Sequence, residues 1–205
     1  MNTQNLNLYF QAVSKAMAAN KDELVALDQV FGDGDLGISM DDGFAAAAKY
    51  TADTAETDLG RYFLDIAHAF NEAAPSSLGT IVAFVFMGMA KSLKGKKEAS
   101  LKEFAEALKA GEENIMKKAE SKLNEKTMLD ALDPAVNALL DAAASGMESS
   151  QALQEAAKAA DQGAEATVDM IAVHGRAAYH TDKTIGHMDG GAKMISIAFD
   201  AVAKA

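Results

Sequence analysis

The segment DQVFGDGDLGISMDDGF, residues 28–44, decides how this chain folds, because it interrupts a pattern that is otherwise helical. Three aspartates stand in its first eight residues, and Gly32 and Gly34 lie among them. Each glycine in a helix interior costs up to about 1 kcal/mol relative to alanine, so one continuous helix through the segment is disfavoured. We therefore expect a helix that ends near Phe31, a tight loop, and a second helix that starts at Ser39 as its N-cap.

On both sides of this segment, apolar residues recur at the spacing of amphipathic helices. One such stripe consists of Leu59, Phe63, Ile66 and Phe70. The chain has only 2 prolines and 6% aromatic residues, and no alternating run of β-branched residues indicates a sheet. The fold class expected is therefore all-α. The predicted helices span residues 4–19, 21–31, 39–53, 57–73, 78–94, 98–120, 129–146, 149–174 and 190–204.

Short connections between these helices predict that sequential neighbours are antiparallel. The loops after the second, fourth, sixth and eighth helices are then expected at one rim, and loops on a rigid scaffold are where function usually resides. No long linker divides the chain, so residues 1–205 are expected to form a single domain. The loops in question are residues 32–38, 73–79, 121–128 and 180–191.

The composition excludes several classes of function. A net charge of −11 argues against binding to a nucleic-acid backbone. The absence of cysteine excludes a disulfide scaffold and thiol chemistry, and it is compatible with a reducing compartment. The most apolar run, Thr80–Ala90, is too short to span a bilayer, and no targeting signal is visible. We therefore expect a cytoplasmic protein that binds neither membrane nor nucleic acid.

The aspartates of the opening segment are Asp28, Asp33 and Asp35. At about 4 Å and an effective dielectric constant of about 20, each pair of carboxylates costs roughly 4 kcal/mol, so their convergence requires a cation. Oxygen ligands suit Mg²⁺ or Ca²⁺, but the glutamate that completes an EF-hand loop is missing. Mg²⁺ whose coordination is completed by nucleotide phosphates fits better. The alternative from spacing alone is a solvated acidic turn.

The same segment resembles the signature of the L subunit of dihydroxyacetone kinase (DhaL), which reads Asp-x₃-Gly-Asp-x-Asp-His-Gly-x-Asn-Met-x-Arg-Gly-Phe. Glu125–Val136 is close to that family's Gly-Asp/Glu-Lys-Thr-Met-x-Asp segment. Gly175–Ala192 is similar to its Gly-Arg-Ala-Ser-Tyr…Ile-Gly-His-x-Asp-Pro-Gly-Ala segment. The three motifs occur in the family's order and cover nearly the whole chain.

This resemblance implies a closed barrel of about eight antiparallel helices with a nucleotide site at one rim. It implies that Asp28, Asp33 and Asp35 hold two Mg²⁺ ions that bridge the phosphates of ADP or ATP. The phosphoryl group would pass to dihydroxyacetone or a related ketose on a separate K-type subunit, and a phosphocarrier protein is a further possible partner. Gly37, Arg176, Asp189 and Gly191 match nucleotide-site positions of the family. The other residues that align with its nucleotide site are Leu36, Ser39, Ser76, Ser77, Asn124 and Gly190.

Several positions depart from the family pattern, although the metal ligands match. Where the family has His, Asn and Arg, this chain has Leu36, Ser39 and Asp42. The family's Gly-rich loop aligns with Glu72–Ser77. Asn124 replaces a Gly of the family, Gly190 replaces a Pro, and Lys193 follows Ala192. We hypothesise that Ser76 and Ser77, at a helix N-terminus, still bind a phosphate; the alternative is N-capping alone. Arg176 or Lys193 would add positive charge.

We therefore expect a phosphotransferase subunit. No residue is expected to act as a nucleophile, because phosphoryl transfer depends on positioning and charge neutralisation by metal ions. The alternative is a non-catalytic nucleotide-binding regulatory or sensor module of the same fold, which Leu36 and the altered loop at Glu72–Ser77 keep open. A purely structural helical interaction protein is a third reading, which the matching aspartates disfavour.

Overall fold

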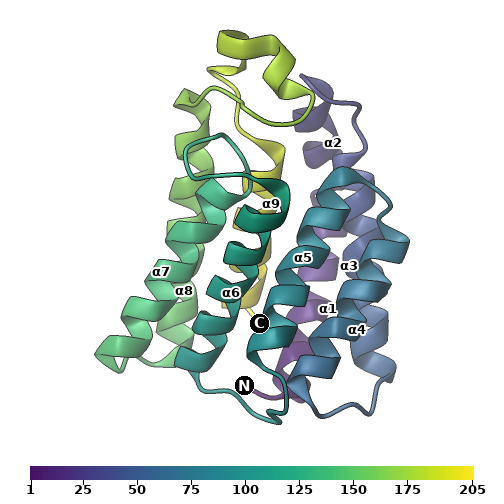
Figure 1. Ribbon diagram of the computed structural model, residues 1–205, viewed down its shortest axis with the longest axis vertical. Helices are drawn as coiled ribbons and strands as arrows, with labels where there is room; N and C mark the ends of the chain where they lie inside the picture. Colours follow the sequence, from purple (N-terminus) through teal and green to yellow (C-terminus); the bar gives the residue numbers. More distant parts are fainter.

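Nine α-helices and two 3-10 segments make up the computed structural model, which describes all residues from 1 to 205 (Figure 1). The helices are α1 (Thr3–Ala19), α2 (Lys21–Gln29), α3 (Leu36–Asp53), α4 (Leu59–Ala73), α5 (Ser77–Ser92), α6 (Leu101–Ala119), α7 (Leu129–Ser145), α8 (Ser149–Ala166) and α9 (Gly190–Ala203). The 3-10 segments are η1 (Thr167–Asp169) and η2 (Ala177–Thr184). The structure contains no strands, which confirms the predicted all-α class.

Eight of the helices form a closed ring. In the order α1, α3, α4, α5, α6, α7, α8 and α9, each helix packs on the next, and α9 packs on α1 to close the ring. Neighbouring helices run antiparallel along the long axis of the molecule (Figure 1). The short helix α2 is not part of the ring and packs at one end against α3 and α9. The predicted barrel of about eight antiparallel helices is therefore confirmed.

The inward stripes of the helices form one apolar core of 45 buried residues. All four residues of the predicted stripe on α4 are buried, and Phe63 lies among the rings of Phe10, Phe86 and Phe104. Such aromatic contacts add roughly 0.5–1.5 kcal/mol each beyond the area they bury. An apolar cavity of about 140 Å³, lined only by hydrophobic side chains, remains inside the barrel. Apolar packing is therefore the main interaction that holds the barrel together.

One rim carries every second connection. The chain segments that follow α2, α4, α6 and α8 lie at the same end of the barrel, as predicted, and the longest of them, residues 167–189, forms a cap over that end (Figure 1). The N-terminus lies at the opposite end. The rim therefore brings together segments that are far apart in the sequence.

Three predicted helix boundaries were wrong by three residues or more, and one of them is the start of the sixth helix, which lies at Leu101 rather than at residue 98. The third helix starts at Leu36 with Asp35 in the N-cap position, rather than at Ser39. Leu36 joins the apolar core. A residue larger than Gly37 would clash in the first turn, because a Cβ there would lie 2.2 Å from the backbone oxygen of Lys21. Only a glycine allows α3 to lie this close to α2, so burial and close packing move the helix start three residues upstream.

The eighth helix ends at Ala166, not at residue 174. The Thr167 hydroxyl donates to the backbone oxygen of Ala164, and the buried ammonium group of Lys126 donates to the backbone oxygen of Thr167. These bonds favour the single 3-10 turn of η1, after which the chain leaves the barrel as an extended segment. A second 3-10 segment, η2, replaces part of the loop predicted over residues 180–191.

No helix has both the length and the apolar character that a bilayer crossing requires. The apolar run Thr80–Ala90 lies within α5, whose buried residues face the barrel core. The cytoplasmic location inferred from the sequence stays a prediction.

A buried carboxyl group lies between α6 and α7. The Glu112 side chain is only 1% exposed; its Oε1 accepts a hydrogen bond of 2.8 Å from Lys109 Nζ, while Oε2 has no partner. Lys109 also donates to Asp133 Oδ1 on α7, at 2.8 Å. Burial raises the pKa of Glu112 to about 7, although the Lys109 contact acts in the opposite direction. Glu112 is therefore the core group whose protonation should affect stability.

We predict that Glu112 makes the fold less stable as the pH rises from 4.5 towards 7. In this range the folded protein keeps a proton that the unfolded chain releases, because the pKa is raised from 4.5 to about 7. The free energy of unfolding should fall by about 3 kcal/mol across this range. In Glu112→Gln this part of the pH dependence should disappear. Urea unfolding at several pH values, monitored by far-UV circular dichroism, would measure it.

The matched control is Glu113→Gln, which changes the charge equally at an exposed neighbouring position. Its stability should follow that of the wild-type protein at every pH. Parallel curves for the wild type and Glu112→Gln would contradict the buried, protonated glutamate.

Candidate functional site

The acidic loop between α2 and α3 is closed by its own first aspartate. Asp28 lies in the last turn of α2, and its Oδ2 accepts a hydrogen bond of 2.7 Å from the backbone N–H of Gly34. Its backbone oxygen accepts from Phe31 and Gly32, at 3.2 and 2.6 Å. Gly34 has a φ of +75°, a conformation that side chains other than glycine rarely adopt. The glycine therefore lets the chain turn back over the end of α2.

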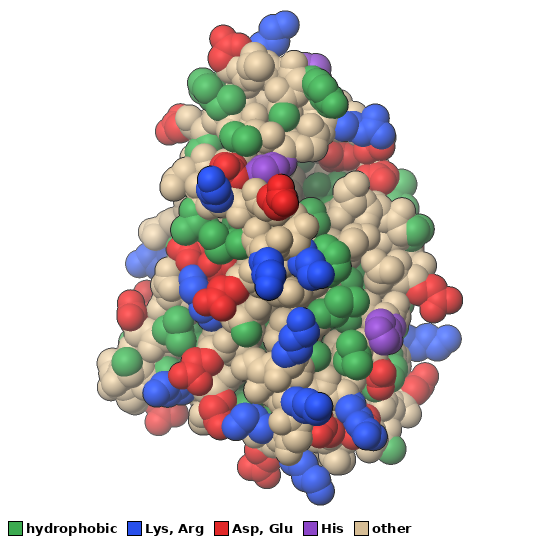
Figure 2. All heavy atoms as spheres, in the orientation of Figure 1, with side chains coloured by type: hydrophobic (Ala, Val, Ile, Leu, Met, Phe, Trp, Pro, Cys, Tyr) green, Lys and Arg blue, Asp and Glu red, His purple; other side chains and the backbone are tan.

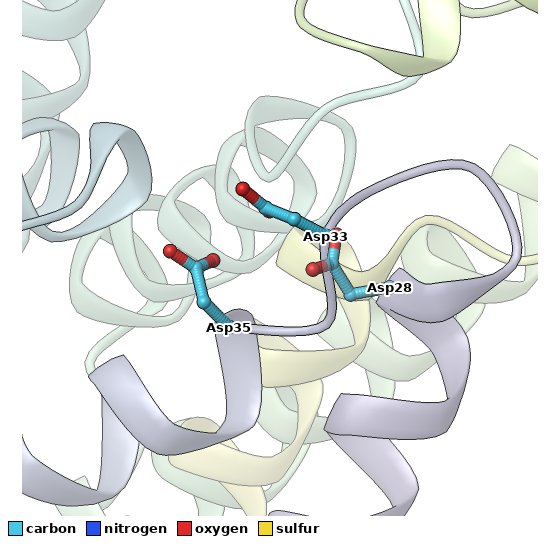
Figure 3. A group of neighbouring side chains, drawn as sticks. All are labelled: Asp28, Asp33 and Asp35. Atoms are coloured by element: carbon cyan, nitrogen blue, oxygen red, sulfur yellow. The ribbon is translucent and has the colours of Figure 1, made fainter.

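This turn brings the three aspartates together. Oxygen atoms of Asp28, Asp33 and Asp35 lie within 4.8 Å of one another, and the side chains of Asp33 and Asp35 point to the same side of the loop (Figure 3). Burial, and then the charges of Asp33 and Asp28, raise the pKa of Asp35 above its usual value. The structure thus has the carboxylate convergence that the sequence predicted.

The donor set of this cluster fits a hard cation. All three side chains offer carboxylate oxygen, the ligand type that Mg²⁺ prefers. Opposite ligands of Mg²⁺ lie about 4 Å apart and adjacent ones about 3 Å, since each bond is about 2.1 Å long, so these oxygens would have to move closer together to bind the same ion. A cation would also offset the repulsion that raises the pKa of Asp35.

The cap over the rim contacts the acidic loop directly. Nη2 of Arg176 donates to Asp33 Oδ2 at 2.5 Å. Both side chains are exposed, so this pair alone adds little stability. The ring of Phe31, at the end of α2, contacts His180 and His187 with ring centroids 5.0 and 5.2 Å apart. Arg176, Phe31 and the two histidines therefore fix the cap beside the three aspartates.

Asp189 ends the cap and starts α9. It is the N-cap of α9, and its Oδ2 accepts from the backbone N–H of Ala192 at 2.8 Å. Burial raises its pKa to about 6, while the Ala192 hydrogen bond and the charge of Lys126 act in the opposite direction. Gly190 and Gly191 are buried in the first turn of α9, and the Gly191 N–H faces the Asp189 carboxylate.

The remaining predicted site residues occupy different environments. Leu36 and Ser39 are buried on α3, and Gly37 packs on α2. Ser76 is the N-cap of α5, and its Oγ accepts from Gly79 N–H at 3.1 Å, as the capping alternative expected. Ser77 is exposed in the first turn of α5. Asn124 is exposed in the loop after α6 with a φ of +65°, and its backbone N–H donates to Asp130.

Sequence reasoning missed two buried charged residues, one in that loop and one directly after it. Asp130, at the start of α7, accepts from the backbone N–H groups of Asn124 and Thr127. Lys126 is 5% exposed, and its ammonium group donates to the backbone oxygens of Thr167 and His187. Both residues stand in the Glu125–Val136 motif that carries the resemblance, so the motif could have pointed to them. The partners of Lys126 lie 41 and 61 residues away, which local pattern cannot indicate.

Leu36 and Gly190 contact each other at the rim. The Leu36 side chain is 8% exposed, and a Cβ placed on Gly190 would lie 2.8 Å from Leu36 Cδ1. These are two of the positions that depart from the DhaL pattern, in which they are His and Pro. The larger apolar side chain at 36 is therefore accommodated by the absence of a side chain at 190.

Comparison with known proteins shows which family this chain resembles. A model of the DAK2 domain matches residues 30–204. The L-erythrulose kinase of Pectobacterium atrosepticum is 31% identical over 193 residues, which are 93% of this chain and 33% of that protein. The ADP-binding subunit DhaL of PEP-dependent dihydroxyacetone kinase 1 from Listeria innocua is 31% identical over 183 residues, 89% of this chain and 86% of that subunit.

A solved structure has the same fold. The crystal structure of the dihydroxyacetone kinase from C. freundii in complex with AMP-PNP and Mg²⁺ superposes with a TM-score of 0.76 at 25% identity. The superposition covers 96% of this chain and 33% of that one. This chain thus spans about a third of the length of the two larger kinases and most of the length of the ADP-binding subunit.

We predict that Gly190→Ala destabilises the protein only while Leu36 is present. The new methyl group would overpack Leu36 and cost about 1 kcal/mol or more. In Leu36→Ala the same change should be neutral or stabilising, because alanine has the higher helix propensity. Urea unfolding of both single variants and the double variant would measure the coupling. Additive effects within about 0.5 kcal/mol would contradict a direct contact.

Proposed function

The chain belongs to the DAK2 domain family, and we propose that it is the nucleotide-binding part of a kinase that phosphorylates dihydroxyacetone or a related small ketose. The observation that carries this proposal is the convergence of Asp28, Asp33 and Asp35 at the rim. The names of two relatives, an L-erythrulose kinase and an ADP-binding subunit of a dihydroxyacetone kinase, support the reaction and the nucleotide. Residues 1–205 act as one nucleotide-binding helical domain in this proposal.

The three aspartates hold Mg²⁺, and two ions are proposed. When bound, the metal supplies neutralisation of the phosphate charge, which is what phosphoryl transfer chiefly requires. Asp28 closes the acidic loop by accepting a hydrogen bond from Gly34 N–H at Oδ2, and its other carboxylate oxygen would be a ligand of the metal. The C. freundii structure, a complex with AMP-PNP and Mg²⁺, supports a metal–nucleotide pair on this fold.

The nucleotide is proposed to be bound by cationic side chains and by backbone N–H groups at helix N-termini. Arg176 lies beside Asp33, where its guanidinium group can donate two parallel hydrogen bonds to a phosphate. At the start of α5, the N–H groups of Ser77 and Leu78 have no acceptor within the chain, so they are available to a phosphate. The Ser76 hydroxyl contributes by capping α5, which orients these N–H groups. Gly190 and Gly191 are also proposed to contact the nucleotide.

The ketose is proposed to bind on a separate K-type subunit that docks on the same rim. The chain matches 86% of an ADP-binding subunit but only a third of two larger kinases. Seven of the ten exposed large apolar residues lie on rim segments, and apolar side chains are visible at the upper end of the molecule (Figure 2). They are Val30, Ile38, Leu123, Ile171, Val173, Tyr179 and Ile185. A partner that covers them would bring its ketose to the nucleotide.

The nucleotide is proposed to act either as free ATP or as bound ADP that a phosphocarrier protein rephosphorylates. The word "PEP-dependent" in the name of the Listeria innocua relative supports the second route. A second candidate function is a nucleotide-binding regulatory or sensor module. It is favoured by Leu36, a buried apolar residue at a position where the DhaL pattern has His.

We predict that the chain binds ADP or ATP only in the presence of Mg²⁺. In Asp33→Asn, the loss of one carboxylate should weaken Mg²⁺-nucleotide binding by about tenfold or more, because a charged ligand is replaced by a neutral one. Isothermal titration calorimetry with and without Mg²⁺ would measure both effects. Binding that does not depend on Mg²⁺, or no binding at all, would exclude the proposed function.

The control for this experiment is Asp53→Asn. It makes the same charge change on an exposed residue at the other end of α3, away from the rim. Its affinity for the Mg²⁺-nucleotide should equal that of the wild-type protein. A loss as large as that of Asp33→Asn would indicate a general effect of net charge rather than a metal site.

We further predict that Tyr179→Ser impairs transfer to the partner but not nucleotide binding. Tyr179 is 88% exposed on the cap, so its removal should not disturb the fold. As an anchor of the docking surface, it should lower kcat/KM for phosphorylation with a ketose-binding subunit roughly tenfold. Met147→Ser, at the opposite end of the barrel, is the matched control. Equal turnover in all three proteins would place the docking surface elsewhere, and turnover in none would favour the sensor.

A further inference from the structure

We propose that Lys126 is a positioning residue that clamps the two ends of the cap and thereby holds Arg176 and Asp189 beside the acidic loop. This inference rests on the proposed function of that site. The Lys126 ammonium group bonds to backbone oxygens of another segment and not to the three aspartates. None of the motifs that point to the metal or the nucleotide requires this role.

The geometry of the clamp comes from two hydrogen bonds. The chain leaves the barrel at Thr167 and returns at His187, and the Lys126 ammonium group donates to the backbone oxygens of both residues. Two further bonds join the same ends: Gly186 N–H donates to the Val168 oxygen at 2.8 Å, and Asp189 N–H donates to the Thr167 hydroxyl at 3.0 Å. The neck of the cap therefore closes around one buried side chain.

The environment of Lys126 is specialised for this contact. It is 5% exposed, and its backbone has a φ of +59°, which is uncommon for a residue with a long side chain. Its loop is held in this conformation by Asp130, which accepts from the N–H groups of Asn124 and Thr127. An ammonium group without partners would be costly at such a site, so the two carbonyl oxygens and the negative charges of Asp189 and Asp130 are what keep it there.

The loop that carries Lys126 also holds the near side of the cap. The Glu125 carboxylate pairs with Nε2 of His174 at 2.6 Å, and the backbone oxygen of Glu125 accepts a hydrogen bond from Val173 N–H at 3.3 Å. Arg176 follows two residues after His174 and reaches Asp33. A continuous path of contacts thus runs from the Lys126 clamp to Arg176, whereas Asp189 lies directly at the neck.

The test uses Lys126→Met, which keeps the length of the side chain but removes its charge and its donors. Lys122→Met, at an exposed position of the same loop, is the matched control. The first measurement is hydrogen exchange, which needs no nucleotide. We expect faster exchange of the backbone N–H groups in residues 170–189 of Lys126→Met, with the helices of the barrel unchanged. Unchanged exchange in residues 170–189 would overturn the proposal.

The second measurement is a double-mutant cycle of Mg²⁺-ADP affinity with Arg176→Ala. If Lys126 acts by placing Arg176 and Asp189, Lys126→Met should weaken binding by about tenfold, and Arg176→Ala should add little to that loss. Fully additive losses would indicate an independent role of Lys126 and overturn the proposal. Absence of binding by the wild-type protein would refute the proposed function, while the exchange experiment would still decide on the clamp.

A second variant covers the case in which Lys126→Met does not fold. Lys126→Gln keeps a donor without the charge and should fold with exchange in residues 170–189 between that of the wild type and that of a disrupted cap. Loss of cooperative thermal unfolding in both variants would show that Lys126 supports the whole fold rather than the cap, and this would also overturn the proposal.

Discussion

The closure of the helix ring around one apolar core is the constraint on which the rest of the structure depends. Each helix has a single apolar stripe, and it can bury that stripe only if neighbours stand on both sides. An antiparallel ring closes without a parallel pair only when the number of helices is even, and eight helices satisfy this condition. Every second connection must then emerge at the same rim. The site is assembled there because the packing of the barrel requires it.

The rim concentrates negative charge, and the chain offsets it with few cations. The protein has a net charge of −11, and three aspartates converge at 28, 33 and 35. Arg176 meets this cluster from outside, whereas Lys126 lies buried beneath the cap near Asp189 and Asp130. The exposed cation is free to exchange Asp33 for another anion, since surface pairs are weak. The buried cation has no such freedom, because it would leave carbonyl oxygens and its own charge unpartnered.

Much of the fold follows from local pattern, and the parts that do not follow depend on distant contacts. The stripe of Leu59, Phe63, Ile66 and Phe70 fixes a helix and its buried face, and Gly34 predicts the turn that brings the aspartates together. The end of α8 could not be predicted, because Lys126 reaches Thr167 from 41 residues away. The start of α3 was misplaced for a similar reason, since the close approach of Gly37 to α2 is a tertiary contact.

The contact between Leu36 and Gly190 bears on whether the site is catalytic. A leucine that replaced a histidine in an otherwise unchanged rim would leave either a clash or an empty space, and both are costly. Here Leu36 is buried in the core, and the bare Cα of Gly190 makes room for it. The two departures from the DhaL pattern are therefore sterically compatible with each other at the rim. In the proposed function, replacement of one polar group by Leu36 changes how the nucleotide is held, whereas the carboxylates that would hold Mg²⁺ remain in place.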